Sequence, residues 1–157
     1  MELTDDLIGL YMERCIELGK MCRGIVGTPY VGSLVVSCSG SIVGEGYKKF
    51  LDNTSYLLHS ERAALDAAGE FAEGNTLFTT LEPCKRAKGA RLKAFISCSE
   101  LIVERGIKRV VFGLDESNSP HGNGSQYLER HEIEIIKYNK LNPIIIGELM
   151  PYRRSAV

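Results

Sequence analysis

The sequence predicts an α/β fold in which one β-sheet is covered by helices on both faces. Segments with the three-to-four-residue periodicity of amphipathic helices alternate with short β-branched segments along the chain. The 157 residues contain no internal repeat, low-complexity tract or long linker, so we expect a single domain over residues 1–157. A chain of this length buries roughly two-thirds of its unfolded surface, which is enough for an independent core.

The first third of the chain predicts a helix and a β-hairpin. Thr4 is a suitable N-cap for a helix whose apolar face is formed by Leu7, Tyr11, Cys15, Leu18 and Cys22. Segments 31–37 and 41–47 are expected to form two strands joined by a turn at Ser39-Gly40. Three thiols lie on these apolar faces and are expected in the core: Cys15, Cys22 and Cys38.

The rest of the chain alternates between predicted helices and strands. We expect helices over 59–69, 94–105 and 124–130, and strands over 76–80, 109–112 and 132–136. With the hairpin, these make a sheet of five strands. The tail over 142–157 contains Ile144-Ile145-Ile146, a strand-like apolar run that a single domain would not bury completely. We therefore expect this tail to contribute to a dimer or higher oligomer.

Charge and composition exclude several classes of function. A formal charge of −1 argues against nucleic-acid or membrane binding driven by net field. The acidic start, Met1 to Asp6, has no apolar run, and no segment approaches the ~20 apolar residues of a membrane helix. We therefore expect a cytoplasmic protein without a signal peptide. Five cysteines in such a chain indicate metal ligands and buried thiols rather than disulfides.

Side chains that could bind a metal occur in three separate segments of the chain. His59-Ser60-Glu61 is followed by Pro83-Cys84 and then by Cys98. Zn²⁺ prefers tetrahedral N and S ligands, and a catalytic zinc site has three protein ligands and a position for water. His59, Cys84 and Cys98 would provide these ligands, which leaves Glu61 as a carboxylate that moves protons. H-x-E followed by P-C-x-x-C is the signature of zinc nucleobase deaminases, although thirteen residues rather than two separate the cysteines here.

Two longer segments resemble the cytidine deaminase superfamily. Residues 80–84, Thr-Leu-Glu-Pro-Cys, are similar to a string shared by tRNA adenosine deaminases and the deaminase domain of the bifunctional riboflavin-biosynthesis deaminase-reductases. Residues 98–113 resemble the helix, turn and strand that follow the last zinc cysteine. The riboflavin-type domain is favoured by the spacing of Asp115, Gly122, Gly124, Leu128, Ile133 and Ile135. The resemblance covers roughly residues 5–138.

The resemblance implies a fold, a cofactor and a set of roles. It implies a three-layer α/β/α sandwich with a five-stranded mixed sheet, and a Zn²⁺ ion held by the ligands above. It also implies that the backbone N–H of Ser60 steadies the nucleophile and that the backbone carbonyl of Glu82 receives the exocyclic amine. Thr28 stands where the family usually has a substrate-holding asparagine, so Thr28 is expected at the substrate. His121, in the Gly-rich loop after the fourth predicted strand, is either a substrate contact or a solvated loop residue.

The segment between the two ligand cysteines is strongly basic. Five cations lie within nine residues and no acid lies among them: Lys85, Arg86, Lys88, Arg91 and Lys93. Such a run is usually a solvated face, but here zinc ligands on either side would hold it at the edge of the site. We expect it to bind a substrate phosphate. Contact with a nucleic-acid backbone, to which Lys48-Lys49-Phe50 could add, is disfavoured because few aromatic residues lie nearby for base stacking.

These observations predict a zinc-dependent hydrolytic deaminase of an amino-pyrimidine nucleotide, similar to the riboflavin-pathway enzyme. A reductase domain like that of the full-length family protein does not follow in this chain, so we expect any reduction step to be performed by another protein. The alternatives are a tRNA adenosine or single-strand cytidine deaminase, a specialised-metabolite deaminase, and a non-catalytic zinc-binding subunit. Glu61 argues against the last, because structural zinc sites are usually closed by a fourth protein ligand.

Overall fold

A five-stranded mixed sheet forms the centre of the molecule. The computed structural model describes residues 1–51, 56–85, 96–116 and 122–150. The strand order is β2-β1-β5-β6-β7; β1 is antiparallel to both of its neighbours, whereas β5, β6 and β7 are parallel. The strands are β1 (Gly32–Val36), β2 (Ile42–Tyr47), β5 (Thr76–Leu81), β6 (Arg109–Leu114) and β7 (Glu134–Lys137). The prediction of a five-stranded mixed sheet is confirmed.

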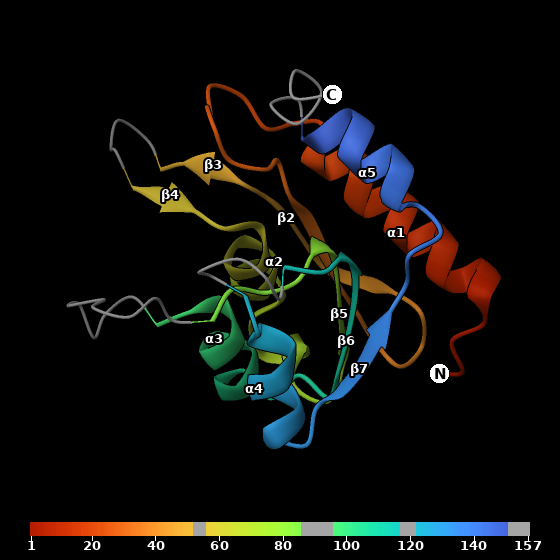
Figure 1. Ribbon diagram of the computed structural model, residues 1–157. Coiled ribbons are helices and arrows are strands. Elements are labelled where there is room, and N and C mark those ends of the chain that lie inside the picture. Colours follow the sequence, from red (N-terminus) through yellow and green to blue (C-terminus); the bar gives the residue numbers. More distant parts are fainter. Residues whose placement is uncertain (52–55, 86–95, 117–121, 151–157) are drawn as a thin grey trace.

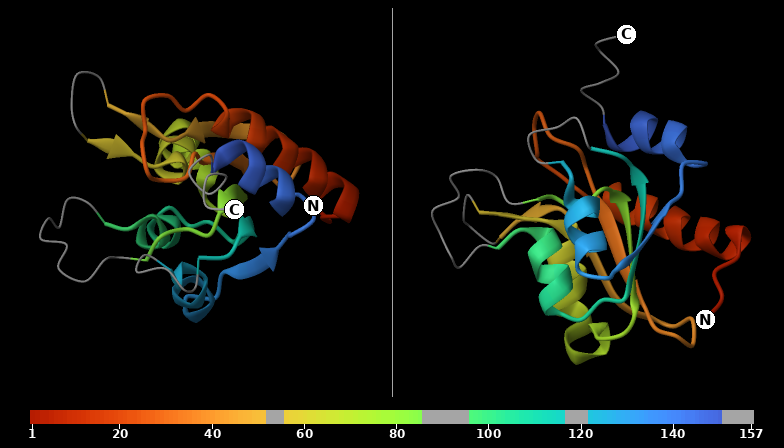
Figure 2. Two further views of the ribbon diagram at one scale, coloured as in Figure 1. Left: turned by 45° about the horizontal axis from the view of Figure 1, so that its top comes forward. Right: turned by 60° about the horizontal axis from the view of Figure 1, so that its bottom comes forward.

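Helices cover both faces of this sheet, as Figures 1 and 2 show. One face carries α1 (Asp5–Gly19) and α5 (Asn142–Leu149). The other carries α2 (Ser60–Ala68), α3 (Cys98–Glu104) and α4 (Gly124–Arg130), with a short 3-10 turn, η1 (Gly69–Ala72), after α2. The three-layer α/β/α sandwich is therefore confirmed.

Strand alternation divides the buried side chains into two cores. Neighbouring residues of a strand point to opposite faces of a sheet, so a strand that is apolar throughout must be covered on both faces. Leu34 and Phe78 pack against α1 and α5, whereas their neighbours Val35 and Leu77 pack against α2 and α3. The buried, β-branched character of β1, β5 and β6 thus results from two helical layers.

In the described part of the tail, residues 142–149 form a helix, so the prediction of a strand-like run at Ile144-Ile145-Ile146 is wrong. Pro143 lies in the first turn of α5, where its fixed φ suits a helix and its missing N–H costs nothing. Ile145 and Leu149, four residues apart, are fully buried in the core that α1, α5 and one face of the sheet share. Ile144 and Ile146 are 48% and 39% exposed, so the apolar run is only partly covered.

Other boundaries also differ from the predictions. Within the described residues α3 begins at Cys98 rather than at 94, because the Ser97 side chain caps the helix by accepting a hydrogen bond from the Glu100 N–H at 3.1 Å. Strand β7 begins at Glu134, two residues later than expected. A short hairpin of β3 (Lys49–Phe50) and β4 (Leu57–Leu58) was not predicted. Cys38 is exposed in the β1–β2 turn, so its predicted place in the core is wrong.

The helices of the described residues are short. The longest, α1, has 15 residues, whereas a membrane-spanning helix needs about 20. None of the helices in the described parts of the chain is long and apolar enough to cross a membrane.

Candidate active site

Several chain segments that carry the predicted site residues meet at one edge of the sheet. Strands β5 and β6 end there, and α2 and α3 begin on the same side (Figure 1). Because β1 runs antiparallel to β5, β1 starts at this edge and β2 returns to it. In open α/β sheets, ligand sites form outside the carboxyl ends of the parallel strands.

His59, Cys84 and Cys98 come together at this edge. His59 is the N-cap of α2, Cys98 is the first residue of α3, and Cys84 follows the end of β5. The His59 Nδ1 atom lies 3.8 Å from the Cys84 Sγ and 3.4 Å from the Cys98 Sγ. All three ligand atoms lie within 4.8 Å of one another. The thirteen-residue spacing of the cysteines therefore does not prevent the cluster from forming.

The donor set fits a tetrahedral zinc ion. Nitrogen at about 2.0–2.1 Å and sulfur at about 2.3 Å from the metal place neighbouring ligand atoms roughly 3.6 Å apart in a tetrahedron. The two N–S separations in the cluster, 3.8 and 3.4 Å, bracket this value. The backbone N–H of Cys98 donates a hydrogen bond to the Cys84 Sγ at 3.4 Å, which stabilises a thiolate at that position.

Charge coupling within the cluster favours a thiolate at Cys84. Hydrogen bonding from Cys98, with a smaller contribution from His59, lowers the pKa of Cys84 to about 4 against the effect of burial. The same interaction with Cys84, together with burial, raises the pKa of Cys98 well above its ordinary value. The hydrogen bond to Cys84 also raises the pKa of His59. A metal ion bound to all three residues would displace the protons held on His59 and Cys98.

Glu61 is held beside the cluster by a chain of hydroxyl groups. The residue is 4% exposed, and its Oε1 accepts a hydrogen bond from the Thr79 Oγ1 at 3.1 Å. Ser33 donates to Thr79 at 2.9 Å and lies 2.7 Å from the Ser60 Oγ. Because each hydroxyl has one proton, the direction of the chain is Ser60 to Ser33 to Thr79 to Glu61. The Ser60 Oγ also lies 3.4 Å from the Glu61 Oε1.

Sequence reasoning missed Ser33 and Thr79. Both are buried polar residues in buried strands, and the pairing of β1 with β5 places them directly opposite each other. A buried hydroxyl in such a strand needs a hydrogen-bond partner. Ser33 and Thr79 could therefore have been predicted to face another polar group.

Glycine lets α2 approach the sheet closely at Glu61. A Cβ atom at Gly46 in β2 would lie 2.4 Å from the Ser60 carbonyl oxygen and 2.5 Å from the Ala64 nitrogen. The first turn of α2 therefore lies directly on the β2 backbone, which sets the depth of Glu61.

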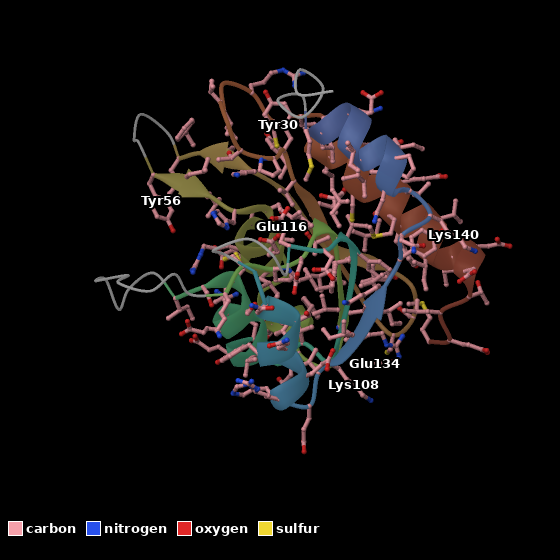
Figure 3. All side chains as sticks on the ribbon, viewed as in Figure 1. Tyr30, Tyr56, Lys108, Glu116, Glu134 and Lys140 are labelled. Carbon is pink, nitrogen blue, oxygen red and sulfur yellow. The ribbon has the colours of Figure 1, made fainter. Side chains whose placement is uncertain are left out.

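The Glu82 carboxylate does not face the cluster but ties three segments together. Its Oε1 accepts the backbone N–H of Glu116 at 2.8 Å, and its Oε2 accepts the N–H and the hydroxyl of Ser125 at 3.0 and 2.6 Å. Figure 3 labels Glu116 at the end of the sheet opposite Lys108 and Glu134. Glu82 thus joins the end of β5 to the chain after β6 and to the start of α4. The role expected for its backbone carbonyl stays a prediction.

Replacing Glu82 by Gln should destabilise the protein, because three donors converge on a side chain that would then have only one acceptor oxygen. Loss of hydrogen bonds to a buried charge costs about 1.5–3 kcal/mol, which corresponds to a drop of roughly 4–10 °C in the melting temperature. Calorimetric unfolding measures this drop. Ser125→Ala removes only one of the bonds and should cause a smaller decrease. An E82Q protein that melts with the wild type would contradict the role of this carboxylate.

The other predicted substrate-binding residues are placed only in part. Thr28 is exposed just before β1, and Lys85 is exposed next to Cys84. Lys48 is buried rather than part of a basic surface strip. Several predicted cations and a histidine lie outside the described residues: Arg86, Lys88, Arg91, Lys93 and His121.

Comparison with known proteins agrees with this site. Residues 7–114 match the family model of the cytidine and deoxycytidylate deaminase zinc-binding region. The chain belongs to this family. A diaminohydroxyphosphoribosylamino-pyrimidine deaminase of Buchnera aphidicola subsp. Acyrthosiphon pisum is 36% identical to this deaminase-family chain over 125 residues, 78% of each protein.

Longer proteins contain a similar region. The riboflavin biosynthesis protein RibD of Aquifex aeolicus is 37% identical over 127 residues, which are 80% of this chain but 33% of that protein. The crystal structure of a diaminohydroxyphosphoribosylaminopyrimidine deaminase/reductase from Thermotoga maritima superposes with a TM-score of 0.77 at 32% identity. The superposed region covers 93% of this chain and 40% of the Thermotoga maritima chain. The predicted resemblance to riboflavin-type deaminase domains is confirmed, and the chain spans about a third to two-fifths of these larger proteins.

Proposed function

We propose that this chain is a zinc-dependent hydrolytic deaminase of an amino-pyrimidine nucleotide, of the diaminohydroxyphosphoribosylaminopyrimidine type. The proposal is carried by one observation. A three-ligand cluster and the buried Glu61 lie together at one sheet edge, in a chain 36% identical to a deaminase of that name over 78% of its length. A three-ligand set with an adjacent free carboxylate is typical of a catalytic rather than a structural zinc site.

Each residue of the site is assigned a chemical task. Bound Zn²⁺ supplies a water whose pKa is lowered to about 7. Glu61 is oriented through Oε1, and we assign its second oxygen to move two protons in turn: the first from the attacking water to the ring nitrogen, and the second from the hydroxyl group formed on the ring to the departing amine. The Ser60 N–H is one of the first donors of α2, which have no acceptor within the helix, so it can hold the attacking oxygen. The Glu82 carbonyl would accept the exocyclic amine.

The substrate is assigned a phosphate because of the basic segment that follows Cys84. Lys85, its first cation, is exposed beside the cluster. A phosphate binds such cations through short charge-assisted hydrogen bonds. Small-molecule nucleotides are therefore the proposed substrates, and tRNA or single-stranded nucleic acid is the competing class.

We also propose that the chain self-associates through its last helix. Ile144 and Ile146 remain exposed on α5 although Ile145 and Leu149 are buried, so an apolar strip is left on the surface. A second copy of the chain would cover this strip in a dimer or higher oligomer.

Ammonia release from a substrate panel tests the proposed function. The panel contains an amino-pyrimidinone ribosylamino phosphate, its dephosphorylated form, cytidine, deoxycytidylate and a tRNA stem-loop. The phosphorylated amino-pyrimidinone should have a kcat/KM at least about 100-fold above those of cytidine and the tRNA, because ring and phosphate contacts each add binding energy. Faster release from the tRNA, with binding that weakens steeply as salt rises, would instead identify a nucleic-acid deaminase.

A further inference from the structure

A buried lysine lies at the same sheet edge as the proposed active site. Lys48 directly follows β2 and is 7% exposed. Its backbone N–H donates to the Val31 carbonyl at 3.1 Å, which continues the β1–β2 pairing beyond Gly32 and Tyr47. The segment that leads into β1 lies beside it. Lys48 is therefore fixed by backbone bonds at the edge where the metal-ligand cluster forms.

Within the described residues, the hydrogen-bond partners of the Lys48 ammonium are neutral groups. Its Nζ donates to the Thr28 Oγ1 at 2.9 Å and to the Pro29 carbonyl at 3.2 Å. Across the described residues no carboxylate forms an ion pair with it. An ammonium has three N–H donors, so these two bonds leave one donor for another group. A buried charge without a counter-ion is unfavourable, and an acceptor from a ligand would relieve that cost.

The free donor shares its surroundings with the catalytic groups. Burial lowers the pKa of Lys48, and the negative charges that Glu61, Cys22, Cys84 and Cys98 carry when ionised oppose this effect. The ammonium therefore lies within electrostatic reach of the proton-transfer carboxylate and of two metal ligands. The Glu61 Oε1 accepts a hydrogen bond from Thr79, and Lys48 donates to Thr28 and Pro29. In the described residues the two charged groups therefore do not form an ion pair with each other.

We propose that Lys48 is a specificity-determining residue that donates a hydrogen bond to a ring oxygen of the substrate, and that Thr28 positions it for this contact. The inference rests on the proposed deaminase function and narrows the substrate to an amino-pyrimidine ring that carries a carbonyl group. A phosphate is a poorer partner for this ammonium, because the nearby Glu61 carboxylate would repel its charge. Lysine has no acceptor, so a ring with an amino group in place of the oxygen is rejected.

Thr28 acts through Lys48 in this arrangement. Its hydroxyl oxygen accepts a hydrogen bond from the Lys48 ammonium, which fixes the position of Nζ. Valine has nearly the same shape as threonine but no hydroxyl, so Thr28→Val removes this bond without creating a large gap. Thr28, which replaces the family's usual asparagine, and Lys48 thus act together in substrate recognition.

The test compares Lys48→Met with the wild type on two nucleotides, an amino-pyrimidinone and its analogue in which hydrogen replaces the ring oxygen. Methionine matches the lysine stem, and exchange of a buried charge for an apolar side chain is often neutral for stability. With the amino-pyrimidinone, KM should rise on the order of 10- to 100-fold while kcat changes little, the effect of one charge-assisted hydrogen bond. With the analogue, wild type and variant should behave alike. Thr28→Val should cause a smaller rise in KM on the oxygen-bearing nucleotide.

Lys49→Met is the matched control. Lys49 is the neighbouring lysine, but it is exposed, with its Nζ 5.5 Å from the centre of the Tyr47 ring, and it should leave both KM values unchanged. Equal losses on both nucleotides in Lys48→Met, or no loss on either, would overturn the assignment. Calorimetric binding of the oxygen-bearing nucleotide to both proteins separates the two proposals. A wild type that binds it more than 10-fold tighter than Lys48→Met but releases no ammonia supports Lys48 and refutes the deaminase function; equal binding refutes Lys48.

Discussion

Glu61→Gln is expected to lower the rate of deamination by roughly three or more orders of magnitude while the fold and the metal content stay unchanged. Glutamine has the size of glutamate but cannot take up a proton, and general acid–base catalysis of this kind contributes about 10²- to 10⁴-fold. The Glu61 carboxylate is buried and held by Thr79, so no bulk water replaces its function easily. The measurement is kcat for ammonia release at matched zinc content. The loss should appear in kcat and in kcat/KM alike, as expected for a group that acts in the transition state.

Thr79→Val provides a graded control for this experiment. It removes the hydroxyl that orients Oε1 but leaves the carboxylate in place, so the expected loss of kcat is smaller, on the order of 10-fold. Activity of Glu61→Gln near that of the wild type would refute the proton-transfer role. If that variant instead loses its zinc, Glu61 would be a structural residue of the metal site.

Most of the sheet was predictable because its strands are short segments rich in β-branched residues, bounded by turn residues. The apolar runs of β1, β5 and β6 are buried on both faces, and the helix at 124–130 was predicted with the observed bounds. The tail was not predictable by the same reasoning. A run of three isoleucines suits either a strand or a helix, and only the burial of Ile145 and Leu149 in the core shared with α1 decides between them.

The metal-ligand cluster was predictable from residue types, whereas the surroundings of the carboxylate and the ammonium were not. His59, Cys84 and Cys98 differ in sequence spacing from the common signature, yet their chemistry restricts what they can bind. The burial of Lys48 depends on the segment before β1, which folds over it and offers Thr28 as a partner. Such a contact between residues twenty positions apart leaves no periodic pattern in the sequence.

Cys98→Ala should lose zinc, and this prediction tests the least regular part of the site. The wild type is expected to hold about one zinc per chain, because His59, Cys84 and Cys98 provide the three protein ligands of an open tetrahedral site. With two ligands left, occupancy after dialysis should fall below roughly a tenth of that value. Elemental analysis of the purified variants measures it. The wild-type affinity should also rise with pH, because the pKa values of His59 and Cys98 are raised and zinc must displace their protons.

The other cysteines of the chain supply the controls for this experiment. Cys38 is exposed in the β1–β2 turn, and Cys22 is buried outside the cluster with its thiol donating to the Val31 carbonyl. Alanine at either position should leave zinc occupancy at the wild-type level, although Cys22→Ala should lower the melting temperature because a buried side chain is lost. Full occupancy in Cys98→Ala, together with loss of zinc in a Cys22 or Cys38 variant, would show that the ligand assignment is wrong. The experiment also tests the start of α3, because the Ser97 cap places Cys98 at the first residue of that helix, with its Sγ 3.4 Å from the His59 Nδ1, despite the thirteen residues between the two cysteines.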